Sequence, residues 1–546
     1  MAEKTLSKLY TDSFLNNWDN SAFSDYEGKD YTFSEIATKI KSLHRFYQLS
    51  GLKTGDKIAV LGRNSSHWGT VFLSALSSGM IIVPILPDFN ESNTNHIINH
   101  SEAKIIFGAK SLLYKVDLQN SDTLQTVITL EDFSLHSSRD EAAASKLADS
   151  FNYFNEHPLE KNSFRFADWD SEATCILSYT SGTSGFTKGV MIPERSLLSN
   201  IVFAQDHMPL LPGHKIVSFL PMAHVYGLLF EFLFPVTLGC HITFLNKMPS
   251  PAVITKVFGE IKPHLILSVP LVIEKIYKKR ILPTIEKPVM KILLNIPGLS
   301  WLILKKIKDK LTETFGGRFF EIVIGGAPLS ADVEHFFRRI KFQFSIGYGM
   351  TECGPLISYE AWDKTIPSSA GRVVDRMEVR IDSEDPYKVV GEIQVKGDNV
   401  MNGYFKNEVA TKESFTEDGW LRTGDLGIID DNNFIYIKGR SKNMILGPSG
   451  QNIYPEEIEA KISNQHYIAE CVITSRQDKL VAMVYPDFEA IKADEINMDD
   501  LPEIMEDNRK KLNSELPKFE QIIAYEMVNE EFEKTPKKNI KRFKYI

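Results

Sequence analysis

The chain has 546 residues, of which 43% are hydrophobic, and a formal net charge of -9 at pH 7. The chain is too long for one simple hydrophobic core, and its length is compatible with roughly two to four domains. The acidic balance excludes non-specific nucleic-acid binding, which needs a basic surface. Four scattered cysteines without CxxC spacing favour neither a zinc site nor a disulfide framework. The N-terminus has no apolar core of signal-peptide length and no apolar window could span a bilayer, so we expect a cytoplasmic protein, at most peripheral to a membrane.

The first part of the chain alternates short apolar runs with helix-like stretches. Apolar runs at 57–62, 80–85 and 103–108 are separated by helix-like segments at 68–77 and 93–100. This alternation predicts an α/β fold in which mostly parallel sheets are covered by helices.

A hydroxyl- and glycine-rich loop, Tyr-Thr-Ser-Gly-Thr-Ser-Gly-Phe-Thr-Lys-Gly-Val, occupies residues 179–190 directly after the apolar run 173–177. Glycines let backbone N–H groups approach phosphate oxygens, the hydroxyls add donors and Lys188 adds a positive charge. The pattern is not the Walker loop, because Phe186 and Thr187 separate Gly185 from the lysine. A flexible Ser/Gly linker would have no reason to follow a buried strand. The loop therefore predicts a polyphosphate site.

The later segments repeat the strand, loop and helix order. Residues 319–324 read as a strand, 325–329 as a loop, Ser330 as a helix cap and 331–340 as a helix, and 342–346 make the next strand. Loops at the carboxyl ends of parallel strands are where open α/β sheets bind ligands.

After residue 391 the pattern changes to short alternating strands, such as 391–396 and 434–438, which predict a β-rich subdomain over about 371–439. A boundary follows near residue 440. Pro455 begins a helix with acidic residues in its first turns, and 470–474 and 479–485 read as strands. We expect a large N-terminal domain over 1–439 and a small α+β lobe over 440–546.

Six motifs stand in one order along the chain, at 179–190, 221–227, 325–330, 347–355, 422–427 and 439–445. Together they resemble the signature of the acyl-adenylating, AMP-binding enzymes, and most closely that of bacterial long-chain fatty acyl-CoA synthetases. The resemblance runs from about Tyr31 to the lysine-rich tail. It implies that the C-terminal lobe is mobile and rotates about a hinge near 440–443 between two half-reactions.

The resemblance implies the substrates ATP, a carboxylic acid and CoA, with Mg²⁺ as cofactor. The residues it assigns to ATP binding are Thr180, Ser181, Gly182, Thr183, Ser184, Gly185, Gly326, Ala327, Pro328, Tyr348, Gly349, Met350, Asp425 and Lys442. The residues it assigns to the reacting centre are Lys188, His224, Thr351, Glu352, Arg440 and Lys538.

Chemistry gives several of these roles a physical reason. A carboxylate beside phosphates needs a cation between them, so Glu352 is the expected magnesium ligand, together with the Thr183 hydroxyl. Tyr348 offers a flat face for adenine, and Asp425 can accept both ribose hydroxyls. Taken alone, these three residues would read as a surface carboxylate, a core tyrosine and a turn former. The resemblance implies that His224 binds phosphate, orients the carboxylate or lines the acyl channel, and no general-base role is proposed for it.

The tail departs from the family pattern, which has Gly-Lys-x-x-Arg. Aligning Arg542 with the family's arginine places Lys538 at the glycine and Asn539 at the lysine. Loss of an ammonium beside a developing charge costs roughly 10²- to 10³-fold in rate, by analogy with one preorganised donor. A small backbone shift would let Lys538 restore the charge. The other interpretation of the tail is a solvated basic end.

Segments 268–277 and 315–319 resemble long-chain fatty acyl-CoA synthetases, so the implied reaction joins a long-chain fatty acid to CoA through an acyl-AMP. Two alternatives remain open: transfer to an acyl carrier protein, and a catalytically silent binding protein lacking the tail lysine. Residues 288–310 mix apolar and lysine side chains, and this mixture indicates either peripheral membrane contact or a helix packed on the domain.

Overall fold

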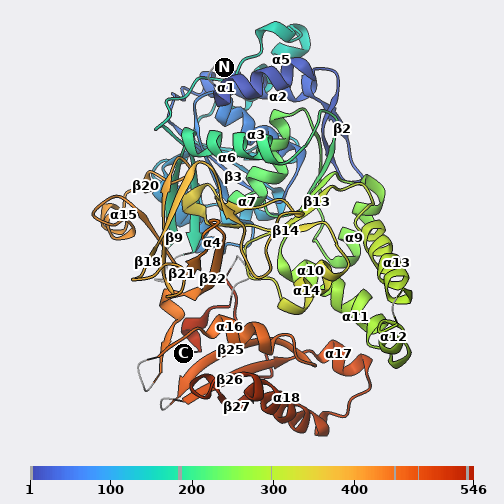
Figure 1. The fold of residues 1–546 in the computed structure, drawn as a ribbon. Helices are drawn as coiled ribbons and strands as arrows, with labels where there is room; N and C mark the ends of the chain where they lie inside the picture. Colours follow the sequence, from blue (N-terminus) through green and yellow to red (C-terminus); the bar gives the residue numbers. More distant parts are fainter. Residues whose placement is uncertain are drawn as a thin grey trace.

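The computed structural model describes residues 4–181, 187–296, 298–447, 451–476, 479–535 and 540–545 (Figure 1). These residues form a large N-terminal body of sheets and helices, with a smaller lobe at its lower end in the view (Figure 1). The predicted α/β class, with mostly parallel sheets covered by helices, is confirmed. Within these described ranges, no helix is both long and apolar enough to cross a membrane.

An eight-stranded sheet forms the centre of the body, in the order β20-β9-β8-β4-β3-β5-β6-β7. Its strands are β3 (Lys57–Leu61), β4 (Ile81–Ile85), β5 (Ala103–Gly108), β6 (Thr126–Thr129), β7 (Leu135–Ser138), β8 (Thr174–Ser181), β9 (Thr187–Pro193) and β20 (Gly403–Tyr404). Strands β8, β4, β3, β5 and β6 run parallel. Alternate residues of β3 enter two separate apolar cores, one on each face of the sheet, which explains why its strands read as continuous apolar runs.

Helices of the first half lie on and around this sheet. They are α1 (Leu6–Asn16), α2 (Phe33–Leu49), α3 (Ser66–Ser77), α4 (Glu91–Ser101), α5 (Ala143–Glu156) and α6 (Glu194–His207). The start of α2 follows from local chemistry, because Thr32 and Glu35 form a reciprocal capping box.

Two further sheets complete the body. The strands of the first are β1 (Ser21–Asp25), β2 (Asp30–Thr32), β10 (Lys215–Ser218) and β11 (His241–Phe244), and those of the second are β12 (Leu265–Ser268), β13 (Glu321–Ile324) and β14 (Phe344–Ile346). The accompanying helices are α7 (Val225–Gly227), α8 (Phe234–Thr237), α9 (Pro251–Ile261), α10 (Pro270–Ile276), α11 (Leu282–Ile285), α12 (Pro288–Leu293), α13 (Leu299–Thr314) and α14 (Ala331–Arg339).

The predicted helix cap at Ser330 is confirmed in position but not in its hydrogen bond. Ser330 lies at the N-cap position of α14, but its side chain makes no capping hydrogen bond. The Ser330 hydroxyl instead donates to the Oδ1 atom of Asn464 in the C-terminal lobe. The Ser330 side chain therefore bonds to a residue distant in sequence instead of to the first turn of α14.

The β-rich region consists of a small sheet and a four-stranded antiparallel sheet. Its strands are β15 (Tyr348–Gly349), β16 (Leu356–Tyr359) and β17 (Arg372–Val373), then β18 (Met377–Asp382), β19 (Gly391–Gly397), β21 (Leu421–Ile429) and β22 (Ile435–Arg440). Helix α15 (Glu408–Ser414) lies at the left edge of the molecule (Figure 1).

The C-terminal lobe has a hydrophobic core of its own, which includes Ile458, Ile473 and Leu512. Its elements are β23 (Ile445–Leu446), β24 (Asn452–Ile453), α16 (Pro455–Ile462), β25 (Ile468–Arg476), β26 (Lys479–Pro486), α17 (Phe488–Ala493), α18 (Leu501–Glu515) and β27 (Ile522–Met527). Its contacts with the body include a hydrogen bond of 2.9 Å from Lys278 Nζ to the carbonyl oxygen of Ser463.

Candidate active site

The predicted phosphate loop connects the two strands of an antiparallel hairpin. Thr180 on β8 lies opposite Lys188 on β9, and Ser181 lies opposite Thr187. The loop residues Gly182, Thr183, Ser184 and Gly185 lie outside the described residues. The hairpin nevertheless fixes both ends of the loop and places Lys188 at its exit.

Lys188 and Glu352 lie close together because a third residue, Tyr404, contacts both. The Lys188 Nζ atom lies 4.8 Å from the centre of the Tyr404 ring, and the Tyr404 hydroxyl donates to Oε1 of Glu352 at 2.9 Å. Burial is the main cause that raises the pKa of the Tyr404 phenol, and the negative charge of Glu352 adds to it. The phenol therefore stays protonated and acts as a hydrogen-bond donor. Strand β20 brings Tyr404 beside Val190 of β9. Sequence reasoning did not assign a role to this tyrosine.

The segment that carries Glu352 is tightly folded. Strand β15 ends at Gly349, and the 3₁₀ helix Thr351–Cys353 begins after the single residue Met350. A Cβ atom at Gly349 would lie only 2.2 Å from the Pro355 carbonyl oxygen, so this position requires glycine. The Met350 N–H donates to that same oxygen at 2.9 Å. Thr351 is buried, whereas Glu352 is half-buried.

Tyr348, Asp425 and Arg440 form a second cluster. The Tyr348 hydroxyl donates to Oδ2 of Asp425 at 2.7 Å, and Arg440 Nε lies 2.8 Å from its Oδ1. Burial raises the pKa of the Asp425 carboxyl, and the Arg440 charge and the Tyr348 hydrogen bond oppose this shift. A carboxylate has about four lone-pair positions, so each oxygen of Asp425 keeps acceptor capacity for a further donor.

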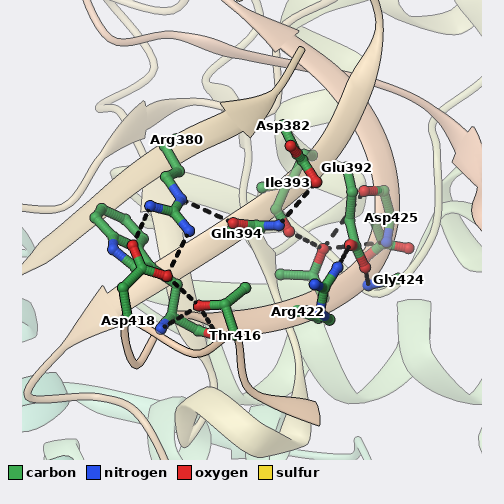
Figure 2. Close-up of polar contacts among 12 residues, drawn as sticks. Arg380, Asp382, Glu392, Ile393, Gln394, Thr416, Asp418, Arg422, Gly424 and Asp425 are labelled. Atoms are coloured by element: carbon green, nitrogen blue, oxygen red, sulfur yellow. Dashed lines mark hydrogen bonds and ion pairs between the residues drawn. The ribbon is translucent and has the colours of Figure 1, made fainter. Parts of the chain in front are cut away.

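The strand turn that presents Asp425 is held by side chains of the β-rich sheet (Figure 2). The Thr423 hydroxyl donates to the Ile393 carbonyl oxygen at 2.7 Å and accepts the Asp425 N–H at 3.0 Å. Glu392 accepts from Arg422 at 2.9 Å and from the Gly424 N–H at 3.2 Å. These contacts fix the backbone of the Arg-Thr-Gly-Asp motif and thereby the position of the carboxylate.

The loop of Gly326, Ala327 and Pro328, which the resemblance assigns to ATP binding and which is here named the adenine-side loop, follows β13. Gly326 has a φ angle of +86°, which favours glycine, and Gly326, Ala327 and Pro328 are all exposed. The loop is held at its far end by Glu274 of α10, which accepts the Ser330 N–H at 2.9 Å. An exposed loop of this kind between fixed ends is suited to receive a ligand.

His224 lies on a loop that other buried side chains hold in place. The Met222 N–H donates to Asn64 Oδ1 at 3.0 Å, and Asn64 Nδ2 donates to the Leu220 carbonyl oxygen at 2.7 Å. Glu231 accepts the N–H groups of Phe219 and Leu220, both at 3.0 Å. Burial raises the pKa of Glu231 well above its usual value. The sequence motif indicated His224 but neither of these supporting residues.

Tyr226 connects the His224 loop to the adenine-side loop. Its hydroxyl donates to the Val323 carbonyl oxygen at 3.0 Å. A Cβ atom at Gly325 would lie 3.2 Å from the Tyr226 ring. The two motifs, distant in sequence, are therefore neighbours in the fold.

The predicted hinge is the 3₁₀ helix Ser441–Asn443, which contains Lys442 and follows β22. It is bordered by the ion pair of Lys438 with Glu457 at 3.0 Å and by a hydrogen bond from Asn443 to Glu456. The first contact joins the end of β22 to α16, and the second joins the 3₁₀ helix to α16.

Lys538 and Asn539 lie outside the described residues, but both sides of this tail segment are anchored. Lys534 pairs with Glu470 at 2.6 Å, and Arg542 pairs with Glu459. Lys534 and Ile540 also form an isolated β-bridge. The tail is therefore fixed to the C-terminal lobe immediately before and after the segment that contains Lys538.

The donor set fits a magnesium ion held jointly with phosphates. In the part of the chain that the structure describes, no group of three or more His, Cys, Asp or Glu side chains could hold a metal by itself. Mg²⁺ commonly binds one or two carboxylates and completes its shell with phosphate oxygens and water. Glu352 supplies one such carboxylate beside the phosphate hairpin, which matches this mode.

The chain belongs to the AMP-binding enzyme family. The family matches residues 13–405, and the AMP-binding enzyme C-terminal domain matches residues 442–546. Among its relatives, the long-chain-fatty-acid–CoA ligase FadD15 of Mycobacterium bovis is 28% identical over 469 residues, covering 81% of this chain and 75% of that protein. A long-chain-fatty-acid–CoA ligase of Bacillus subtilis is 27% identical over 515 residues, covering 88% of this chain and 84% of that protein.

Solved structures share the fold over nearly the whole chain. ATP-bound MatB from Rhodopseudomonas palustris superposes with a TM-score of 0.76 at 22% identity, covering 99% of this chain and 98% of that one. The o-succinylbenzoate–CoA synthetase MenE from Bacillus subtilis, in complex with ATP and magnesium, gives a TM-score of 0.74 at 18% identity and covers 98% of each chain. At these identities the match establishes the fold.

Proposed function

We propose that this chain is an ATP-dependent acid–CoA ligase, and that its acid is a long-chain fatty acid. The observation that carries the proposal is the arrangement of Lys188, Tyr404 and Glu352 beside the phosphate hairpin, with the Tyr348, Asp425 and Arg440 cluster as a second anchoring point. A lysine and a carboxylate bridged by one phenol are suited to a magnesium-bound polyphosphate. The names of the relatives support CoA as acceptor and a long-chain acid as substrate.

In the first half-reaction a carboxylate oxygen of the acid attacks the α-phosphorus of ATP. A new P–O bond forms, the bond to pyrophosphate breaks, and acyl-AMP results. Lys188 and the loop donors stabilise charge on the leaving pyrophosphate, while Asp425 holds the ribose so that the attack is in line. Bound Mg²⁺ would be held by Glu352 and the Thr183 hydroxyl, and would neutralise charge shared between the phosphates.

In the second half-reaction the CoA thiolate attacks the acyl carbon, and AMP leaves with the electrons of the broken C–O bond. Rotation of the C-terminal lobe about residues 440–443 is part of this proposal. Arg440, whose side chain is 61% exposed and paired with Asp425, is the hinge residue through which that rotation would reach the ribose site.

The test is AMP release from ATP and Mg²⁺ with acids of short, medium and long chain, each with and without CoA. We expect AMP release that requires both a long-chain acid and CoA, and an E352Q variant that loses most of it. AMP release with carrier protein but not with CoA would assign the chain to acyl carrier protein loading. ATP binding without AMP release from any acid would instead identify a silent binding protein.

A further inference from the structure

Helices α12 and α13 expose an apolar surface that the fold does not use. In the segment over residues 282–310, the described side chains include none that is fully buried, although much of the segment is apolar. The two helices lie on the right-hand flank of the body, with α12 near its lower tip (Figure 1). The α12–α13 surface consists of Val289, Ile292, Ile296, Leu299, Trp301 and Leu302, which are 68%, 66%, 43%, 37%, 62% and 50% exposed.

The two faces of α13 separate cleanly. Leu304, Ile307 and Leu311 follow helical spacing and pack on the core, where α13 contacts α9. Trp301 and Leu302 lie on the exposed side together with Lys305 and Lys306. The inward stripe therefore accounts for the attachment of α13 to the body, and the outward apolar residues have no role in that attachment.

The outward residues of α12 also follow a helical pattern. Val289 and Ile292 stand at i and i+3, which places them on one side of α12, and Ile296 follows in the turn after the helix. A stripe of this kind normally faces a core, but here it faces outwards. Exposed apolar side chains gathered on one short segment favour an interaction surface over the single scattered apolar residues that are normal on a protein surface.

The charges around the surface indicate what covers it. Residues 287–310 contain six lysines and one aspartate, within a chain whose net charge is -9. Lys305 Nζ lies 5.4 Å from the centre of the Trp301 ring, so an interfacial aromatic residue and a cation are already adjacent. Lysine stems can lie along an apolar layer while their ammonium groups reach the phosphates above it.

A second copy of the chain fits this surface poorly. In a two-fold dimer the same patch occupies both sides of the interface, so the lysine-rich segments would face each other, and like charges across an interface are unfavourable. An anionic lipid surface offers the opposite charge and an apolar layer below it.

We propose that the α12–α13 surface docks this protein on an anionic membrane, with Ile292 and Trp301 entering the interface and the lysines contacting lipid phosphates. The segment continues from α10 through the π-helical turn Tyr277–Ile281 and α11, and Glu274 of α10 holds the loop at Ser330. Docking would therefore place the lipid surface on the helical segment that borders the candidate active site. The proposal does not depend on the assignment of the acid.

The test is co-sedimentation of the full chain with vesicles, without ATP or acid, so that it is independent of catalysis. We expect binding to vesicles containing phosphatidylglycerol, weaker binding to pure phosphatidylcholine, and weaker binding at high salt. The double variant I292D/W301D should bind phosphatidylglycerol vesicles at least tenfold more weakly, the equivalent of about 1.4 kcal/mol. The variant K305E/K306E should lose binding to anionic vesicles specifically.

The matched control is the double variant Y387D/V409D, whose parent residues are 52% and 70% exposed in the β-rich region; it should bind as the parent does. Thermal unfolding of all variants checks that the fold is intact. Equal vesicle binding by parent and I292D/W301D would overturn the proposal, as would no binding by the parent. A dimer in vesicle-free solution that I292D/W301D converts to a monomer would assign the surface to a second copy instead.

Discussion

Replacing Asp425 with asparagine should separate nucleotide binding from stability. Asparagine keeps the size of the side chain and one acceptor for the Tyr348 hydroxyl, but removes the charge. Burial raises the pKa of Asp425, so the folded chain binds this proton more tightly than the unfolded chain. Its ionisation therefore lowers the free energy of unfolding as pH rises above the unfolded pKa. The paired Arg440 is 61% exposed, and its attraction is screened by water.

Two expectations follow for the D425N variant at neutral pH. The free energy of unfolding should stay the same or rise slightly, because a buried charge has been removed. If the ribose hydroxyls donate to the carboxylate, ATP affinity should fall. A hydrogen bond to a charged group contributes about 1.5–3 kcal/mol and a neutral one about 0.5–1.5 kcal/mol. Over two hydroxyls the loss is roughly 2–3 kcal/mol, or about 30- to 150-fold in Kd.

The assay pairs isothermal titration of ATP with Mg²⁺ present and urea unfolding of the same samples. The control is D418N, in the same β-rich region, where Asp418 pairs with Arg380 and accepts from Thr416 on the surface (Figure 2). D418N should bind ATP as the parent does. A D425N variant that binds ATP normally but unfolds more readily would refute the reasoning and make Asp425 a structural residue.

Three further predictions concern two buried carboxyl groups and the tail lysine Lys538. The E231A variant leaves the N–H groups of Phe219 and Leu220 without their acceptor. Its free energy of unfolding in urea should therefore fall by roughly 2–6 kcal/mol, and its kcat should fall because the His224 loop loses support. The E231Q variant should recover most of the stability and most of the activity. Burial raises the pKa of Glu321 to about 7. The free energy of unfolding should therefore decline between about pH 4.5 and 7, by up to about 1.4 kcal/mol per pH unit for this one group. The E321Q variant should flatten that decline, and an unchanged slope in pH-dependent unfolding would reject the assignment. K538A should depress acyl-AMP formation, measured by pyrophosphate exchange, if Lys538 supplies the missing charge; full exchange by K538A would reject that role.

Local patterns in the sequence were enough to predict the central sheet. The runs at 57–62, 80–85 and 103–108 became β3, β4 and β5 with bounds shifted by at most about one residue, because strands buried on both faces read as continuous apolar runs. The helix from Pro455 was equally clear, since proline at its first position and acidic residues in its first turn are local signals.

The contacts that assemble the candidate site were not predictable in this way. Tyr404 meets Glu352 from 52 positions away, and Tyr348 meets Asp425 from 77 positions away. Periodicity and capping rules describe neighbours in sequence and carry no information about such pairs. The same limit explains Ser330, which lies at the predicted N-cap but donates its hydroxyl to the amide oxygen of Asn464 across the lobe contact and makes no capping hydrogen bond.

Residues 348–353 join the two clusters of the candidate site. Tyr348 contacts Asp425 and through it Arg440 at the start of the proposed hinge, while Glu352 contacts Tyr404, which lies against Lys188 beside the phosphate hairpin. The segment between them is held at two consecutive residues, because Gly349 packs closely against the Pro355 carbonyl oxygen and the Met350 N–H donates to that oxygen. A shift of Arg440 away from Asp425 would therefore act on the same short segment that holds the proposed magnesium ligand. This connection gives a physical route by which lobe rotation would change the phosphate site, and it needs no contact between the lobe and the phosphates themselves.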